Sequence, residues 1–253
     1  MVLIVRILPN LYLVGSGAVG LSNAGDCHVY LVDAGDSLIM FDAGGGAETE
    51  RILHNVKAEG LQPENISHIL LTHAHRDHAN GSNALTALLP DQSLTFATSE
   101  REAYFLAHGT PEELGLDKLG MGHLPRTVSY PPFEVNTMLA DGEIITIGNC
   151  QIKAIYAPGH SPGCICYLVE LNGCRILFCG DVIYHGGMIS LGTWLGSDLQ
   201  QYQQSIRKLG QLEIDALMPG HFLWSIAGGQ EHINKAIRSF DGLWPPPSIN
   251  LIP

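Results

Sequence analysis

The sequence contains little charge, few basic residues and no long apolar run. Charged residues make up 15% of the 253 residues, against roughly 25% in an average soluble domain, which excludes a disordered chain or a coiled coil. No stretch reaches the roughly 18 consecutive apolar residues of a transmembrane helix. Only 13 lysines and arginines stand against 25 acidic residues, for a formal net charge of −12. Because an acidic surface repels phosphate backbones, we expect a small-molecule substrate, with no nucleic-acid and no membrane partner.

The cysteines form no C-x-x-C pair, and several lie inside apolar runs. This pattern predicts buried, reduced thiols in a cytoplasmic protein, although the even count of six leaves a disulfide framework open. The N-terminus is apolar but short, and Arg6 and Pro9 interrupt it. Because no small-residue cleavage site follows, we expect no signal peptide.

Apolar periodicity predicts short strands and helices that recur twice along the chain. In the first half, strands are expected at 11–14, 28–32, 38–41, 66–72 and 94–97, and helices at 48–59 and from residue 80. In the second half, strands are expected at 144–147, 150–156, 164–170, 175–179 and 214–218. Asp198 and Gln201 form a capping box that opens one more helix, and 231–240 reads as the last. This order predicts a layered sandwich with sheets inside and helices outside.

Residues 99–135 differ from the rest because helix-like pieces and a proline-rich loop occur together there. We expect this segment to be an insertion that caps the functional cleft, within a single domain spanning residues 1–253. A dimer surface is the alternative, so a homodimer stays open. Within the cap, Tyr104, Phe105 and Leu106 are candidates for an apolar wall of the substrate site.

Histidines and aspartates gather directly after four strand-like runs. The first cluster, residues 72–78, reads Thr-His-Ala-His-Arg-Asp-His, and three single ligands follow glycines at 159, 180 and 220. Because functional sites of α/β proteins lie at the carboxyl ends of strands, we expect these side chains to meet around metal ions. Imidazoles with carboxylates suit two divalent ions, with zinc favoured and iron or manganese as alternatives. The predicted ligands are His73, His75, Asp77, His78, His160, Asp181 and His221.

The succession of H-x-H-x-D-H, G-H, G-D and G-H resembles the metallo-beta-lactamase superfamily, over nearly the whole chain. The resemblance implies an α+β fold, the four-layer αββα sandwich. It also implies that His73, His75 and His160 bind one ion, that Asp77, His78 and His221 bind the other, and that Asp181 bridges both. Asp42 resembles a carboxylate that supports the ligands in this family, although a simple turn aspartate fits equally well.

A dinuclear centre of this kind predicts metal-dependent hydrolysis. Two ions about 3.5–4 Å apart acidify water, so we expect a bridging hydroxide to attack the carbonyl of a small ester or lactone. Asp77 is a catalytic candidate, because it can orient the nucleophile and pass a proton to the leaving group. Tyr184, three residues after Asp181, resembles a tyrosine of the acyl-homoserine lactonase branch that hydrogen-bonds the substrate. A plain packing role for Tyr184 stays open.

Three other reactions of the superfamily remain alternatives. They are thioester hydrolysis of the glyoxalase II type, iron-dependent persulfide dioxygenation, and phosphodiester hydrolysis. Glyoxalase II enzymes carry a helical domain after the last metal histidine, whereas only a short segment follows His221. Class B beta-lactamases carry cysteine or serine where Asp181 stands, so beta-lactam hydrolysis is not expected. The resemblance therefore favours lactones and carboxylic esters.

Overall fold

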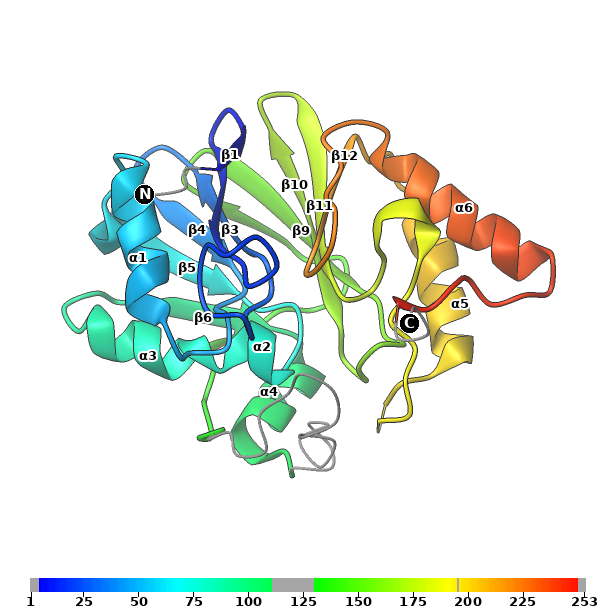
Figure 1. The fold of residues 1–253 in the computed structure, drawn as a ribbon, viewed down its shortest axis with the longest axis horizontal. Helices are drawn as coiled ribbons and strands as arrows, with labels where there is room; N and C mark the ends of the chain where they lie inside the picture. The colour runs from blue at the N-terminus through cyan, green and yellow to red at the C-terminus, as the bar shows by residue number, and fades with distance from the viewer. Residues whose placement is uncertain (1–4, 111–129, 195, 250–253) are drawn as a thin grey trace.

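A computed structural model of the chain describes residues 5–110, 130–194 and 196–249. In these residues two β-sheets lie face to face, and helices cover the outer face of each sheet (Figure 1). The N-terminal half of the chain supplies one sheet with its helices, and the C-terminal half supplies the other. This is the layered arrangement that the order of elements predicts. Much of the expected cap, residues 111–129, lies outside the described residues.

The first sheet has seven strands, in the order in which they occur along the chain. Neighbouring strands are antiparallel from β1 to β4 and parallel from β4 to β7. The pattern of apolar residues does not predict β1 and β7, because these strands are too short to show an alternation of apolar and polar residues. The strands are β1 (Arg6–Leu8), β2 (Leu11–Gly15), β3 (Val29–Asp33), β4 (Leu38–Phe41), β5 (Ile66–Leu70), β6 (Thr95–Thr98) and β7 (Thr137–Met138).

The second sheet has five strands in the order β12-β11-β10-β9-β8. Strands β8 to β11 form an antiparallel meander, and β12 lies parallel to β11. All five are predicted from the sequence, each close to its expected bounds. The strands are β8 (Ile144–Ile147), β9 (Cys150–Tyr156), β10 (Ile165–Leu171), β11 (Cys174–Gly180) and β12 (Ala216–Pro219).

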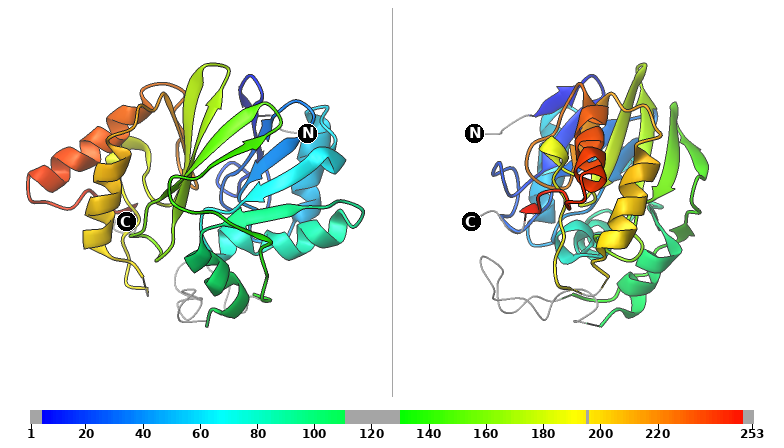
Figure 2. Two further views of the ribbon diagram at one scale, coloured as in Figure 1. Left: turned by 180° about the vertical axis from the view of Figure 1, so that it is seen from behind. Right: turned by 90° about the vertical axis from the view of Figure 1, so that its right-hand side faces the viewer.

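The helices form the two outer layers, seen from behind in Figure 2. Those of the first half are α1 (Thr49–Ala58), α2 (Arg76–Ala79), α3 (Gly81–Leu88) and α4 (Glu100–His108), with a 3-10 turn at Pro63–Asn65. Those of the second half are α5 (Leu199–Leu209) and α6 (Gly229–Asp241), with a 3-10 turn at His185–Gly187. As expected, Asp198 caps α5, because its carboxylate accepts the backbone N–H groups of Gln200 and Gln201 at 2.8 and 3.0 Å. Among the described residues, no helix combines the length and apolarity needed to cross a membrane.

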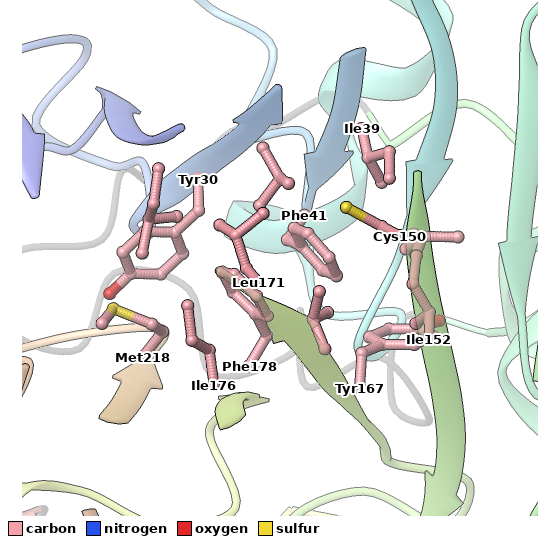
Figure 3. Close-up of a cluster of buried hydrophobic side chains, with 14 of the residues drawn as sticks. Tyr30, Ile39, Phe41, Cys150, Ile152, Tyr167, Leu171, Ile176, Phe178 and Met218 are labelled. Atoms are coloured by element: carbon pink, nitrogen blue, oxygen red, sulfur yellow. The ribbon is translucent and has the colours of Figure 1, made fainter. Parts of the chain in front are cut away.

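The main core lies between the sheets (Figure 3). Phe41 of β4 stacks on Phe178 of β11, with ring centroids 3.7 Å apart and planes 3° apart. In β11, Ile176 and Phe178 face this core, whereas Leu177 and Cys179 face α5 and α6. From Ile176 to Cys179 both faces of the strand are therefore buried, which explains why this stretch is a continuous apolar run rather than an alternating one.

Helix α4 corrects one expectation about the cap. Phe105 and Leu106 are 3% and 2% exposed and belong to the core under the first sheet, so the interpretation of these two residues as a substrate wall is wrong. Tyr104, on the other side of the helix, is 49% exposed and packs edge-on against His108. The helix spacing separates the two roles, since neighbouring positions on a helix face in different directions.

All six cysteines are free thiols. Five of them are buried, and Cys174 is half-buried. Because none is paired, the sheets are held together by packing and hydrogen bonds rather than by disulfides. The expectation of buried thiols holds for five of the six cysteines.

The two sheets are joined at one edge, where their parallel strands end. Strands β9, β11 and β12 share one direction, because β10 is antiparallel to both β9 and β11 and β12 is parallel to β11. The hydroxyl of Tyr30 donates to the carbonyl of Pro219 at 2.7 Å, and that of Tyr167 donates to Leu71 at 2.8 Å. Pro219 is the last residue of β12, and Leu71 directly follows β5. Each hydrogen bond therefore ties one sheet to a strand end of the other sheet. The loops that leave these strand ends therefore meet at one place.

Candidate metal centre

Four loops bring the predicted ligands to this edge. The cluster at 72–78 follows β5, and His160, Asp181 and His221 come shortly after β9, β11 and β12. Gly220 leaves no space for a side chain, because a Cβ there would lie 2.5 Å from Oδ1 of Asp181. The glycine is thus required by the close packing of the ligands.

The first ligand group consists of three histidines. Nδ1 of His75 lies 3.0 Å from Nε2 of His73 and 2.9 Å from Nε2 of His160. The opposite nitrogens are occupied, since Nδ1 of His160 donates to the carbonyl of Ser190 at 3.0 Å and Nδ1 of His73 lies 3.1 Å from the Thr72 hydroxyl. The ligand atoms of the three histidines lie within 4.8 Å of one another. Their spacing and orientation suit a single ion.

The second ligand group consists of Asp77, His78 and His221. Nε2 of His221 lies 3.0 Å from Oδ2 of Asp77 and 3.3 Å from Nε2 of His78. Nδ1 of His78 donates to Oδ2 of Asp42 at 2.8 Å, which leaves Nε2 to face the group. Asp42 also accepts the backbone N–H of Thr72 at 2.7 Å. It therefore supports the ligands from behind and is more than a turn residue.

Asp181 lies between the two groups. Its Oδ1 is 3.3 Å from Nε2 of His78 and 3.6 Å from Nε2 of His221, whereas its Oδ2 is 3.5 Å from Nε2 of His160. Oδ1 is buried, and it accepts no hydrogen bond from the part of the chain that the structure describes. A buried carboxylate oxygen without a donor is costly unless a cation compensates it. The residues therefore fit two divalent ions with Asp181 between them.

Burial sets the charge of the first group. It lowers the pKa of His75 to about 3, and it also lowers the pKa of His73 and of His160. These imidazoles are neutral at pH 7, the form in which histidine binds a metal. No proton has to be removed from them before an ion can enter.

The carboxylates set the charge of the second group. Burial alone would lower the pKa of His221, but Asp181 and Asp77 outweigh it and raise that pKa. Burial alone would raise the pKa of Asp77, but His78 and His221 outweigh it and lower that pKa. His221 and His78 likewise lower the pKa of Asp181 against the effect of burial, so both aspartates are ionised at neutral pH. The donor set offers imidazole nitrogens and charged carboxylate oxygens, which suits borderline divalent ions.

Two further polar side chains, Tyr184 and Cys27, lie beside the ligands. Tyr184 is fully buried, and its hydroxyl makes no hydrogen bond to the described residues. Burial and the neighbouring Asp181 carboxylate raise the pKa of Tyr184. The thiol of Cys27 lies near Asp42 and His78, but burial raises its pKa, so it stays protonated at neutral pH. Tyr184 therefore offers a neutral hydroxyl next to the ligands, and Cys27 offers no thiolate.

His28 is a residue of the centre that the sequence does not reveal. Its ring is buried, with Nδ1 2.8 Å from the Ser16 hydroxyl and Nε2 2.7 Å from the carbonyl oxygen of Phe222. Its backbone N–H donates to the carbonyl of Gly220 at 2.6 Å. His28 therefore fixes the loop that carries His221 on both sides of that ligand. No local pattern predicts this, because Phe222 lies 194 residues away along the chain.

Trp194 is a second such residue. Its indole N–H donates to the carbonyl of His160 at 2.8 Å. Its ring centroid lies 5.2 Å from that of His160 and 5.9 Å from that of His75. Trp194 thus places an aromatic ring beside the first ligand group. The tryptophan stands in a stretch without periodicity, so only the fold relates it to the histidines.

Known proteins resemble this chain in sequence and in fold. Residues 22–221 match the family model of the metallo-beta-lactamase superfamily. The chain is 25% identical over 214 residues to an atrochrysone carboxyl ACP thioesterase of Aspergillus fumigatus, covering 84% of this chain and 56% of the relative. It is 29% identical over 156 residues to the acyl-coenzyme A thioesterase MBLAC2 of Gallus gallus, covering 60% and 54%. The match thus spans about half the length of each of these relatives.

A solved structure agrees over the whole fold. A mutant of a metallo-beta-lactamase from Cronobacter sakazakii superposes with a TM-score of 0.73 at 21% identity, covering 96% of this chain and 97% of the other. At that identity the similarity concerns the fold alone, and it confirms the predicted αββα sandwich of the α+β class. The matched family model includes all of the ligand loops, from the cluster at 72–78 to His221. The chain therefore belongs to the metallo-beta-lactamase superfamily.

Proposed function

We propose that this protein is a dinuclear metal-dependent hydrolase that cleaves an acyl bond, with thioesters and carboxylic esters as its substrates. The position of Asp181 carries the proposal, because its two oxygens face two separate ligand groups. Two divalent ions, for which we propose zinc, would acidify a water molecule and polarise the acyl carbonyl. The superfamily supports hydrolysis, and the thioesterase names of two relatives favour a carbon–sulfur bond.

The proton transfers fall to Asp77 and Tyr184. Asp77 is partly exposed, so one face of its carboxylate can reach a water molecule and the leaving group. It would take a proton from the attacking water and return it to the departing sulfur or oxygen. The neutral hydroxyl of Tyr184 would donate to the oxygen on which negative charge develops.

Apolar side chains next to the ligands suit an acyl group. Trp194 stands beside the first ligand group, and Phe222 follows His221 directly and is 48% exposed. Leu223 is 65% exposed. These side chains would contact the hydrocarbon part of a substrate, whereas the net charge of −12 disfavours a nucleic acid by long-range repulsion.

A substrate panel tests the proposal. The zinc-loaded protein would be assayed for kcat/KM with an acyl-coenzyme A, S-lactoylglutathione, an aryl ester, a cephalosporin and a phosphodiester. We expect a thioester or ester to exceed the cephalosporin and the phosphodiester by more than tenfold. A faster phosphodiester or cephalosporin would refute acyl-ester hydrolysis. Oxidation of a persulfide by the iron-loaded protein, with no hydrolysis of any substrate, would refute the hydrolase itself.

A lactone is the second candidate, and Tyr184 favours it. When the ring opens, the leaving alkoxide stays attached to the substrate and needs a proton donor nearby. A buried phenol beside Asp181 is suited to that task. If an acyl-homoserine lactone, added to the panel, exceeds every thioester tenfold, the lactone takes first place and the carbon–sulfur preference is wrong.

A further inference from the structure

Glu102 is a buried carboxylate that lies outside the ligand set. It stands in the first turn of α4 and is 1% exposed. Its Oε2 accepts the backbone N–H of Ala74 at 2.7 Å. Its Oε1 accepts the hydroxyl of Ser161 at 2.5 Å and the backbone N–H of Gly163 at 2.8 Å. Three donors from two loops therefore converge on one side chain.

These donors are adjacent to the first ligand group. Ala74 stands between His73 and His75, and Ser161 directly follows His160. Ser161 and Gly163 are far in sequence from the ligands of the second group. Ala74 lies in the loop that also carries Asp77 and His78, but it is adjacent to ligands of the first group. Glu102 therefore connects the loop after β5 to the loop after β9, and so connects the two chain segments that supply the first group.

The start of α4 reinforces the same connection. The Ser99 hydroxyl accepts the backbone N–H of Glu102 at 3.3 Å and donates to the carbonyl of Gly163 at 2.6 Å. The Tyr130 hydroxyl donates to the carbonyl of Ala74. Ala74 and Gly163 are thus each held through the backbone carbonyl as well as through the N–H that Glu102 accepts. Such a fixed geometry compensates for the cost of burying a carboxylate.

We propose that Glu102 is a positioning residue for the first metal ion. By holding Ala74 and Ser161 against α4, it fixes the separation between His75 and His160, whose facing nitrogens lie 2.9 Å apart. The second group has its own support, because Asp42 bonds His78 directly. The two groups are therefore held by different carboxylates. This inference concerns metal binding and does not depend on which acyl bond is cleaved.

Glu102→Gln tests the proposal with little change in shape. An amide has one accepting oxygen, so either the N–H of Ala74 or the donors of Ser161 and Gly163 must face an NH2 group. The full-length variant would be measured in two backgrounds by Co2+ titration, with visible absorption and chelator competition as readouts. His221→Ala leaves the first ligand group complete, and His160→Ala leaves the second complete.

We expect Glu102→Gln to weaken Co2+ binding about ten- to a hundredfold in the His221→Ala background, the usual effect of removing an outer-shell partner. In the His160→Ala background, binding should not change. Glu100→Gln is the matched control, because Glu100 lies in the same turn of α4 but is exposed. It should alter neither affinity.

Equal weakening in both backgrounds would show that Glu102 is only structural, and no weakening in either would also overturn the proposal. Should Glu102→Gln fail to fold, Ser161→Ala replaces it, because it removes one of the three donors and leaves the carboxylate in place. It should weaken Co2+ binding in the His221→Ala background alone, by less than Glu102→Gln would. An unchanged affinity in that background would refute the role of Glu102.

Discussion

Oδ2 of Asp42 accepts a hydrogen bond from Nδ1 of His78 across 2.8 Å, and both side chains are buried. The bond fixes the ring so that Nε2 faces the second ligand group. Asp42 has a positive φ of 60°, an uncommon backbone conformation outside glycine. The fold keeps this conformation at the end of β4, where the carboxylate reaches Thr72 and His78 together. The orientation of His78 is thus set by Asp42, a residue outside the ligand set.

Asp42→Asn should therefore weaken zinc binding by the second ligand group. An amide cannot accept from both the Thr72 N–H and Nδ1 of His78, and asparagine tolerates the same backbone conformation. We expect zinc affinity of that group to fall about ten- to a hundredfold. Equilibrium dialysis at fixed free zinc, followed by metal analysis, measures it. Asp36→Asn, in an exposed turn, is the control. Two ions retained at the wild-type affinity would contradict the role of Asp42.

Asp181→Ala should bind one ion fewer and lose most activity. Asp181 is the residue whose oxygens face both ligand groups, so its removal leaves the two ligand groups without a shared anion. Elemental analysis of the purified, zinc-loaded variant should give close to one metal per chain, against two for the wild type. Two tightly bound ions in the variant, or one in the wild type, would rule out the dinuclear assignment.

The sequence predicts the ligands and the layers because both leave local signals. A histidine or aspartate directly after a strand and a glycine can be recognised without the fold, as His160 and Asp181 illustrate. The buried strands are long enough to show a continuous apolar run, as in β11. These signals depend on residues that are neighbours in the sequence, so they can be recognised before the fold is known.

The supports of the ligands leave no such signal. Glu102 looks like any other acidic residue in the first turn of a helix, where a carboxylate is common. Only the fold shows that its oxygens bind two loops, 28 and 59 residues away along the chain at Ala74 and Ser161. The prediction that Phe105 lines the substrate site is wrong because the exposure of a residue on a short helix cannot be inferred until the packing face of that helix is known. Long-range contacts decide these positions.

Stability should depend on the protonation of His28 between pH 6.5 and 4. Burial lowers the pKa of His28 to about 4 from 6.5. Between these values the unfolded chain binds a proton that the folded protein does not, so stability is present above pH 6.5 and is lost as the pH falls. The full effect is on the order of 3 kcal/mol.

The measurement is the urea midpoint of unfolding at pH 7 and at pH 5, in wild type and in His28→Gln. The wild type should lose more stability on acidification than the variant, because glutamine does not titrate. His54→Gln, at an exposed position of α1, should behave as the wild type does. Equal losses in wild type and His28→Gln would contradict this prediction.

Tyr184→Phe separates chemistry from packing. The hydroxyl of Tyr184 is buried, lies near Asp181 and makes no hydrogen bond to the described residues. A buried hydroxyl without a partner costs roughly 1–3 kcal/mol, so its removal should leave stability unchanged or slightly higher. If the hydroxyl assists the oxyanion or the leaving group, kcat should fall about ten- to a hundredfold, or roughly 1.4–2.7 kcal/mol.

The comparison of two tyrosines makes this test specific. Tyr202 is equally buried, but its hydroxyl bonds the backbone carbonyls of Asp181 and Ser190 at 3.0 Å. Tyr202→Phe should therefore lower the melting temperature, because it leaves buried carbonyls without that donor. Tyr184→Phe should leave the melting temperature in place and lower kcat at constant zinc content. If kcat of Tyr184→Phe stays at the wild-type value on every ester, thioester and lactone, Tyr184 is a packing residue, and the proton must reach the leaving group from Asp77 alone.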